Sequence, residues 1–280
     1  MNNSPPDSQR PADLAIIERI EREAFLELYA AAPPAFTANF GIGSAEAVGY
    51  AMLGARAVPF FELNRVLGLG TEVPLTEEQL DGAIDWSERH CNPMYAIAHV
   101  VGAEPPELLD WLATRGFRRE GTDWTKLRRG TDPVVPQPIA TNLEVREIGP
   151  DQGATFGSIF AQAYGFPPDF ADWIAGMVGR PKVRAYLAYA GTTPVGSGLM
   201  YVNHQWAWLG FGATLTEHRC QGAQAAILTR RIADGLAMGL HGFTVETTEQ
   251  ENSSYRNIER AGFKLAYTRA NYHRPPGLGA

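Results

Sequence analysis

Apolar positions recur along the chain with spacings that predict alternating helices and strands. In Leu14–Ala31 they return every three or four residues, which is the spacing of one helix face, and Pro33-Pro34 ends that helix. In the first half, short apolar or alternating runs predict strands at Ala35–Phe40, Ala47–Leu53, Leu63–Leu69, Tyr95–Val100 and Arg118–Leu127. The same half has two further helical segments, Leu75–His90 and Pro106–Arg115.

The second half repeats this alternation. Helices are expected at Asp151–Ala163, Pro168–Val178, Ala223–Met238 and Ser253–Ala261. Strands are expected at Leu143–Ile148, Val183–Ala190, Val195–Val202, Trp206–Leu215, Phe243–Thr247 and Lys264–His273. His204 lies at the expected hairpin turn between two of these strands, and Gly239 is placed to end the longest helix.

Between the halves, Gly130–Asn142 has three prolines and no periodicity, which is typical of a semi-rigid linker. The sequence therefore predicts one domain over 1–130, a linker over 131–141 and a second domain over 142–280. The halves also resemble each other, because Leu112–Phe117 is similar to Ile258–Phe263 and each segment is followed by a predicted strand. The similarity is short, so an internal repeat and a chance likeness both remain open.

Composition and charge narrow the possible classes. The chain of 280 residues is 45% hydrophobic and 20% charged, which are values of globular proteins. Residues 1–140 hold 12 Lys and Arg against 20 Asp and Glu, and residues 141–280 hold 12 against 11, so no basic region favours nucleic acid. No run approaches the roughly 20 apolar residues of a membrane span, and no signal segment is visible. Cys91 and Cys220 are too few for a disulfide framework and have no metal-ligand company. We therefore expect a cytoplasmic protein without a metal.

The stretch with the clearest chemistry is Arg219-Cys220-Gln221-Gly222-Ala223-Gln224. It joins a predicted strand to the long helix that follows. Backbone N–H groups of such a loop, together with the N-terminus of the helix, form a site for an anion such as a phosphate. Arg219 adds positive charge, and Gly222 lets the backbone approach a ligand closely.

This loop resembles the acyl-CoA pyrophosphate loop of GNAT-type N-acetyltransferases, because it reads Arg219-x-x-Gly222-x-Gln224. Gln224 departs from the small residue that the family has there. Thr216–His218 before the loop, Asn252–Ser254 and Arg260–Phe263 are also similar to family motifs, so the resemblance covers roughly residues 142–274. It implies an α/β (α+β) fold in which two GNAT-like domains each have a mixed, mostly antiparallel sheet flanked by helices.

The resemblance also implies which residues bind acetyl-CoA. Backbone N–H groups of four loop residues would hold the pyrophosphate beside Arg219: Gln221, Gly222, Ala223 and Gln224. Free backbone groups at the end of the preceding strand would bind the pantetheine arm, with Thr214 or Leu215 polarising the thioester carbonyl: Ala213, Thr214 and Leu215. Asn252 and Ser254 would contact the amides and the phosphate end of the arm.

The catalytic residues are less clearly marked. Glu246 is the candidate general base, although a glutamate at a strand end can equally cap a helix or pair with an arginine. Ile258 stands where the family often has the tyrosine that protonates the leaving thiolate. Tyr255 lies one helical turn earlier and is the candidate acid, with Tyr267 and Tyr272 as alternatives.

The function expected is transfer of an acetyl group from acetyl-CoA to an amine of a small-molecule or peptide acceptor, by a monomer or homodimer. An aromatic segment from Tyr164 to Asp169 could shape the acceptor pocket, or could serve only to pack helices. The first domain should not bind CoA, because the segment after Gly70 lacks Arg-x-x-Gly and contains Glu72, Glu77 and Glu78. The alternatives are a CoA-binding sensor or scaffold without turnover, and a binding module that uses the acidic first half.

Overall fold

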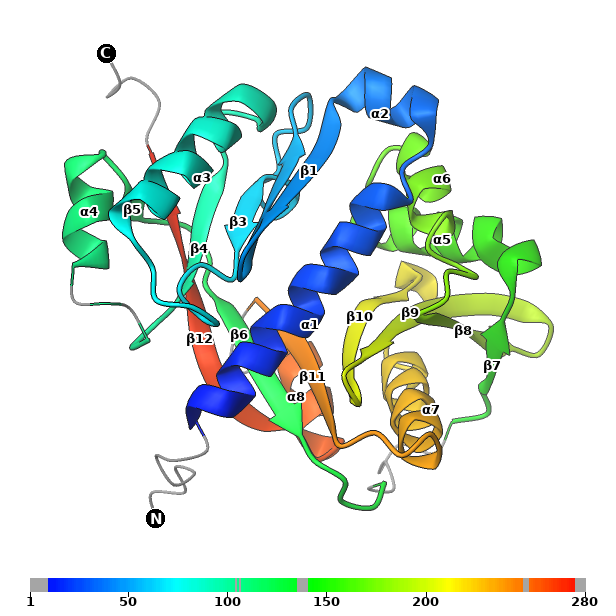
Figure 1. Cartoon of the computed structure of the whole chain (residues 1–280). Coiled ribbons are helices and arrows are strands. Elements are labelled where there is room, and N and C mark those ends of the chain that lie inside the picture. The colour runs from blue at the N-terminus through cyan, green and yellow to red at the C-terminus, as the bar shows by residue number, and fades with distance from the viewer. Residues whose placement is uncertain (1–9, 104, 106, 135–140, 249–251, 275–280) are drawn as a thin grey trace. The chain divides into compact units, whose positions relative to one another are not determined.

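The computed structural model describes residues 10–103, 105, 107–134, 141–248 and 252–274, and the chain divides into two compact units (Figure 1). Unit 1 consists of residues 1–29, 37–124 and 267–280, and unit 2 of residues 30–36 and 125–266. Two strands belong mostly to the other unit than the predicted domain boundaries imply. β6 (Trp124–Arg129) belongs to unit 2 from Thr125 on, and β12 (Lys264–His273) belongs to unit 1 from Tyr267 on. Residues 135–140 of the predicted linker lie outside the described residues.

Unit 2 is built on a sheet with the strand order β6-β11-β10-β9-β8-β7. Its other strands are β7 (Glu144–Ile148), β8 (Val183–Ala190), β9 (Thr193–Asn203), β10 (Trp206–Thr214) and β11 (Gly242–Thr247). Its helices are α5 (Gly153–Tyr164), α6 (Asp169–Ala175), α7 (Ala223–Ala237) and α8 (Ser253–Arg260). Neighbouring strands are antiparallel except β10 and β11, which are parallel and are connected through α7.

Unit 1 has a sheet with the order β1-β2-β3-β4-β12, and β5 pairs with β12. Its other strands are β1 (Ile42–Ala47), β2 (Tyr50–Ala55), β3 (Arg65–Leu67), β4 (Ala96–Val100) and β5 (Arg118–Arg119). Its helices are α1 (Arg10–Ala30), α3 (Glu77–His90) and α4 (Leu108–Thr114). Here β3 and β4 are the parallel pair, connected through α3.

Both units therefore share one topology: antiparallel strands, then a parallel pair joined by a helix, then a second helix. In each unit the strand beside the second parallel strand comes from the other half of the sequence, since β12 pairs with β4 and β6 pairs with β11. The predicted α/β class with mixed, mostly antiparallel sheets is confirmed.

Each unit buries its own apolar core. In unit 2, α7 packs Leu228 and Ile232 into a cluster with Phe243 of β11. In unit 1, α3 packs Leu80 and Ile84 against the sheet. Helix α3 begins with a capping box, in which Thr76 and Gln79 bond to each other's backbone N–H groups, so local hydrogen bonds fix its start two residues after the predicted Leu75.

Some predicted elements differ from the structure. The segment predicted as the strand Ala35–Phe40 is a helix, α2 (Pro34–Phe40), and proline at the first helical position favours this outcome. The predicted strand Ala47–Leu53 is a hairpin turn with parts of β1 and β2, because Gly49 takes a φ of 87° at the turn. The predicted strand Arg118–Leu127 is split into β5 and β6. The expected turn at His204 is confirmed, with positive φ at His204 and Gln205.

A buried ion cluster joins the two ends of unit 1. The guanidinium of Arg269 on β12 donates from Nη1 and Nη2 to the Glu21 carboxylate of α1, at 2.7 and 2.8 Å. Tyr267 Oη donates to Glu18 at 2.6 Å. Burial raises the pKa of Tyr267 well above its ordinary value, and the negative charge of Glu18 adds to the shift. The first helix and the last strand of the chain are thus fixed to each other by charge.

Candidate functional site

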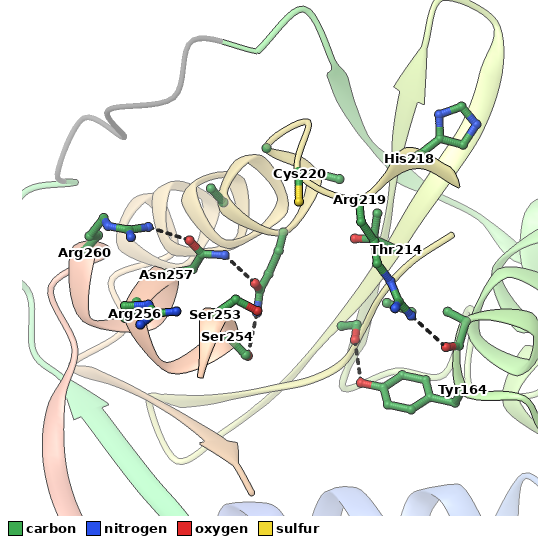
Figure 2. A pocket seen from close by; sticks show the side chains of 17 residues that line it. Tyr164, Thr214, His218, Arg219, Cys220, Ser253, Ser254, Arg256, Asn257 and Arg260 are labelled. Atoms are coloured by element: carbon green, nitrogen blue, oxygen red, sulfur yellow. Dashed lines mark hydrogen bonds between the residues drawn. The ribbon is translucent and has the colours of Figure 1, made fainter. Parts of the chain in front are cut away.

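A cavity of about 540 Å³ lies within unit 2, where the end of β10, the loop after it and helix α8 come together (Figure 2). The end of α5 forms another part of its wall. Its lining residues are Ala163, Tyr164, Gly212, Ala213, Thr214, His218, Arg219, Cys220, Gly222, Ala223, Gln224, Ala225, Ser253, Ser254, Arg256, Asn257 and Arg260. Seven of the ten residues predicted to bind the cofactor are among them: Ala213, Thr214, Arg219, Gly222, Ala223, Gln224 and Ser254.

The loop between β10 and α7 and the N-terminus of α7 both line this cavity. Gly222 is the N-cap residue and has a φ of 86°, a left-handed conformation that glycine adopts without strain. The N-cap side offers no side-chain hydrogen bond to the first N–H groups of α7. These N–H groups therefore need another acceptor, and the helix dipole favours an anion there. Arg219 also lines the cavity, and its Nη2 donates to the Ala163 carbonyl of α5 at 3.2 Å.

The charge of the cavity wall has one sign. Three arginines line it, Arg219 from the loop and Arg256 and Arg260 from α8, and none of the described lining residues is Asp or Glu. Figure 2 shows Arg219 on one side of the cavity and the α8 arginines on the other. Guanidinium groups bind phosphates well because they present several donors in a plane. The wall is suited to a polyanionic ligand.

Gln224, the residue that departs from the family pattern, points its side chain at α8. Its Nε2 donates to Ser254 Oγ at 2.8 Å, and its Oε1 accepts from Asn257 Nδ2 at 2.7 Å. Arg260 Nη1 in turn donates to Asn257 Oδ1 at 2.7 Å. The long side chain thus links α7 to α8 and leaves the N-terminus of α7 uncovered.

The end of β10 diverges from β11. The two strands pair over Trp206–Trp208, and within the described part of the chain no strand pairs with the rest of β10 on that side. On the other side Leu215 N–H donates to the Val195 carbonyl at 3.0 Å. Since backbone groups alternate in direction along an antiparallel strand, those of Thr214 point away from β9, toward the open side. Of the predicted pair, Thr214 has backbone groups available to a ligand, whereas the Leu215 N–H is already bonded.

A β-bulge precedes this end of β10. Phe211 and Gly212 lie opposite Gly198 of β9, and Phe211 has a φ of 51°. Arg231 of α7 reaches this position from the core, where its Nη1 donates to the Leu199 and Gly210 carbonyls at 2.7 and 3.1 Å. Burial lowers the pKa of Arg231 to about 10. The bulge is therefore held by a buried guanidinium, which the sequence analysis did not single out.

The two predicted catalytic residues do not line the cavity. Glu246 lies on β11, directly opposite Lys126 of β6, and its Oε2 accepts from Lys126 Nζ at 2.6 Å. This arrangement matches the alternative of an ion pair, with a lysine in place of the arginine. Tyr255 packs on the core of unit 2, and Tyr267 and Tyr272 belong to unit 1.

Three predicted cofactor-binding residues also lie off the cavity wall: Leu215, Gln221 and Asn252. Asn252 is the N-cap of α8: its Oδ1 accepts from Tyr255 N–H at 2.7 Å, and its Nδ2 donates to Thr247 Oγ1. Gln221 is exposed, and its carbonyl accepts from Thr141 Oγ1 at 2.9 Å. Asn252 therefore has a structural role in the helix start, and the carbonyl of Gln221 is already bonded to Thr141.

Two features are absent from the described ranges. No three His, Cys, Asp or Glu side chains gather there closely enough to hold a metal ion. No helix within those ranges combines the length and apolar character that crossing a bilayer requires.

Comparisons with known proteins identify the fold. No protein-family model matches the sequence, and no curated protein sequence matches it. Solved structures do match. A GCN5-related N-acetyltransferase from Kribbella flavida has 16% identity and a TM-score of 0.59 over 89% of this chain and 96% of its own. One from Sphaerobacter thermophilus has 15% identity and a TM-score of 0.58, with 96% and 95% covered.

The likeness also extends to a protein with two such domains. A tandem GNAT protein from the clavulanic acid biosynthesis pathway has 14% identity and a TM-score of 0.57, with 95% of this chain and 94% of its own covered. The chain has a GNAT-type fold in a tandem arrangement. At these identities the likeness establishes the fold, and the chemistry has to be argued from the site.

Proposed function

We propose that unit 2 is an N-acetyltransferase that binds acetyl-CoA in this cavity and transfers the acetyl group to an amine of a small molecule or peptide. The observation that carries the proposal is the cationic wall around an uncapped helix N-terminus. Arg219, Arg256 and Arg260 face a space without carboxylates, which suits the pyrophosphate and the 3′-phosphate of a coenzyme A ester. The GNAT-type fold supports the same ligand.

The chain's own groups would divide the binding. The N–H groups at Gly222, Ala223 and Gln224 would hold the pyrophosphate, with Arg219 beside them. The open side of β10 would pair with the pantetheine arm through Thr214. A bound acetyl-CoA supplies an activated acyl group, and the protein contributes by orienting it against the amine.

Glu246 remains the proposed base, acting through water. Its Oε2 accepts from Lys126 Nζ at 2.6 Å, and a water molecule would have to connect it to the amine, because Glu246 lies off the cavity wall. If Glu246→Gln leaves both the rate and its pH profile unchanged, this role is wrong.

Unit 1 is proposed not to bind the coenzyme. In the loop after β3, which corresponds to the loop after β10, Glu72 is held by two arginines of α1. Arg22 Nη1 donates to the Glu72 carboxylate at 2.5 Å, and Arg19 Nε donates to it at 2.7 Å. An acidic side chain thus takes the cations that a phosphate would need.

The experiment is calorimetric titration with acetyl-CoA of the parent and of Gly222→Glu, which puts a carboxylate at the phosphate position. We expect micromolar binding to the parent and at least a 100-fold loss in the variant. Gly191→Glu is the matched control, because Gly191 has a positive φ like Gly222 but lies in the β8–β9 turn, with nothing within 4 Å of an added Cβ. The proposal is refuted if the parent does not bind, or if both variants bind like the parent.

A second candidate is a CoA-binding sensor without turnover. It is favoured by two observations: Glu246 is engaged by Lys126, and Tyr255 lies off the cavity wall. A panel of an aminoglycoside, an amino acid, a polyamine and a peptide N-terminus separates the two, with release of free thiol as the readout. Binding with no acetylated product across the panel would favour the sensor.

A further inference from the structure

One tyrosine lines the cavity among the described residues, and it is not one of the predicted acids. Tyr164 is the last residue of α5, and Gly165 follows it in the left-handed conformation that ends the helix. More than half of the Tyr164 side chain is exposed. Figure 2 shows its ring beside Arg219, with the hydroxyl directed at β10.

The hydroxyl is held at the bulge of β10. Tyr164 Oη donates to the Gly212 carbonyl at 2.9 Å, one residue before Ala213 and two before Thr214. These two residues form the open end of β10, which also lines the cavity. A phenol is therefore fixed next to Thr214, which the proposed function assigns to the pantetheine arm and which the sequence resemblance places at the thioester carbonyl.

Neighbouring rings fix the direction of Tyr164 although it is exposed. Its ring centroid lies 4.7 Å from that of Phe160, one helical turn earlier, and 6.3 Å from that of Phe166. Phe160 also contacts Phe211 of the bulge, at 5.1 Å. Aromatic pairs at these distances restrict ring motion. The position of the hydroxyl is thus set by packing as well as by its hydrogen bond.

We propose that Tyr164 is the proton donor to the sulfur leaving group, a role that rests on the proposed function. Its O–H turns from the Gly212 carbonyl to the sulfur. The amine nitrogen forms a bond to the acyl carbon, the carbon–sulfur bond breaks, and its electron pair goes to sulfur. The Tyr164 Oη proton passes to that sulfur and yields the thiol. The new amide nitrogen loses one proton to water, and the phenolate regains one from water.

The chemistry of a phenol suits this step. With an ordinary pKa of about 10, a tyrosine hydroxyl is protonated at neutral pH and can stabilise a thiolate by hydrogen bonding before it gives up its proton. Exposure of Tyr164 gives water access for the return of the proton. The assignment also explains how a chain with Ile258 at the usual acid position can retain a donor.

The test compares two probes, CoA and desulfo-CoA, in which hydrogen replaces the thiol. At about pH 9 much of the CoA thiol is ionised, since an ordinary thiol has a pKa of about 8.5. We expect Tyr164→Phe to weaken CoA binding about tenfold, the effect of one hydrogen bond to a charged group, and to leave desulfo-CoA binding unchanged. With the amine found in the panel, kcat should fall about 100-fold while KM for acetyl-CoA stays within about threefold.

Tyr189→Phe is the control. It removes a hydroxyl that accepts from Gln152 Nε2 at 2.8 Å, and Tyr189 does not line the cavity. The proposal is overturned if Tyr164→Phe weakens the binding of CoA and desulfo-CoA equally, or weakens neither. It is also overturned if Tyr255→Phe, and not Tyr164→Phe, weakens CoA binding selectively. Failure of the proposed function looks different, since the parent itself then binds neither probe. For a sensor without turnover, the binding comparison alone decides.

Discussion

The ion pair between Lys126 and Glu246 allows a direct test of the strand exchange in unit 2. Lys126 comes from β6 in the first half of the sequence and is fully buried. The Glu246 side chain on β11 is 12% exposed, and the two charged atoms lie 2.6 Å apart. The perturbation is Lys126→Met, which removes the charge and keeps a long apolar stem.

The expected cost follows from burial. At an effective dielectric constant near 20, two unit charges 2.6 Å apart attract by about 6 kcal/mol. Removing two ions from water offsets most of this gain, so the intact pair contributes little net stability. Removing one partner is different, because the remaining charge stays buried without compensation. We expect Lys126→Met to destabilise the β6–β11 region by about 3–5 kcal/mol.

The double variant provides the control. Lys126→Met combined with Glu246→Leu replaces the pair by apolar side chains and should lie within about 1 kcal/mol of the parent. The assay is native-state hydrogen exchange of the β6 and β11 amides, because a chain of two units need not unfold in one step. A cost below about 1 kcal/mol for Lys126→Met, or a double variant as unstable as the single one, would refute the reasoning.

Two further predictions concern unit 1. Arg269→Met should destabilise it by about 3–5 kcal/mol, because the buried Glu21 loses its bidentate partner; hydrogen exchange of β12 measures this. Burial would raise the pKa of Glu72, but hydrogen bonds from Arg19 and Arg22 lower it below 4.5. Its folded pKa is depressed, so its stabilising contribution is present above pH 4.5 and is lost as the pH falls through the folded value. Between pH 6 and pH 3 the free energy of unfolding should therefore fall less steeply in Glu72→Gln than in the parent. Equal slopes in the two proteins would contradict this prediction.

Local signals in the sequence predicted loop residues that the structure brings together on the cavity wall. Arg219, Gly222 and Gln224 lie within six residues, so a strand, a tight loop and a helix suffice to bring them together. The helix after the loop was also predictable, because its apolar stripe has helical spacing and Gly239 ends it with a φ of 77°. Such features need no knowledge of long-range pairing.

Other parts depend on contacts that spacing cannot reveal. Glu246 and Lys126 are 120 residues apart and meet only because β6 pairs with β11. Tyr164 was visible as part of an aromatic segment, but its bond to Gly212 depends on a bulge 48 residues later. The error at Ala35–Phe40 has another cause, since a short apolar run fits a helix and a strand equally well.

The exchange of strands leads to one more prediction, on where the chain can be divided. A fragment cut at the linker, 142–280, lacks β6, so the edge of β11 would expose unpaired N–H and C=O groups beside Phe243 and Val245. It would also carry residues 267–280 away from β4, which pairs with this part of β12. The fragment 125–266 keeps the sheet of unit 2 complete and keeps Lys126 beside Glu246. We expect 125–266 to be monodisperse and to melt cooperatively, and 142–280 to aggregate or melt at a much lower temperature. The two fragments both lack residues 30–36 of unit 2, so the effect of that loss on stability is the same in each. If 142–280 melts at the same temperature as 125–266, β6 is not an essential part of unit 2.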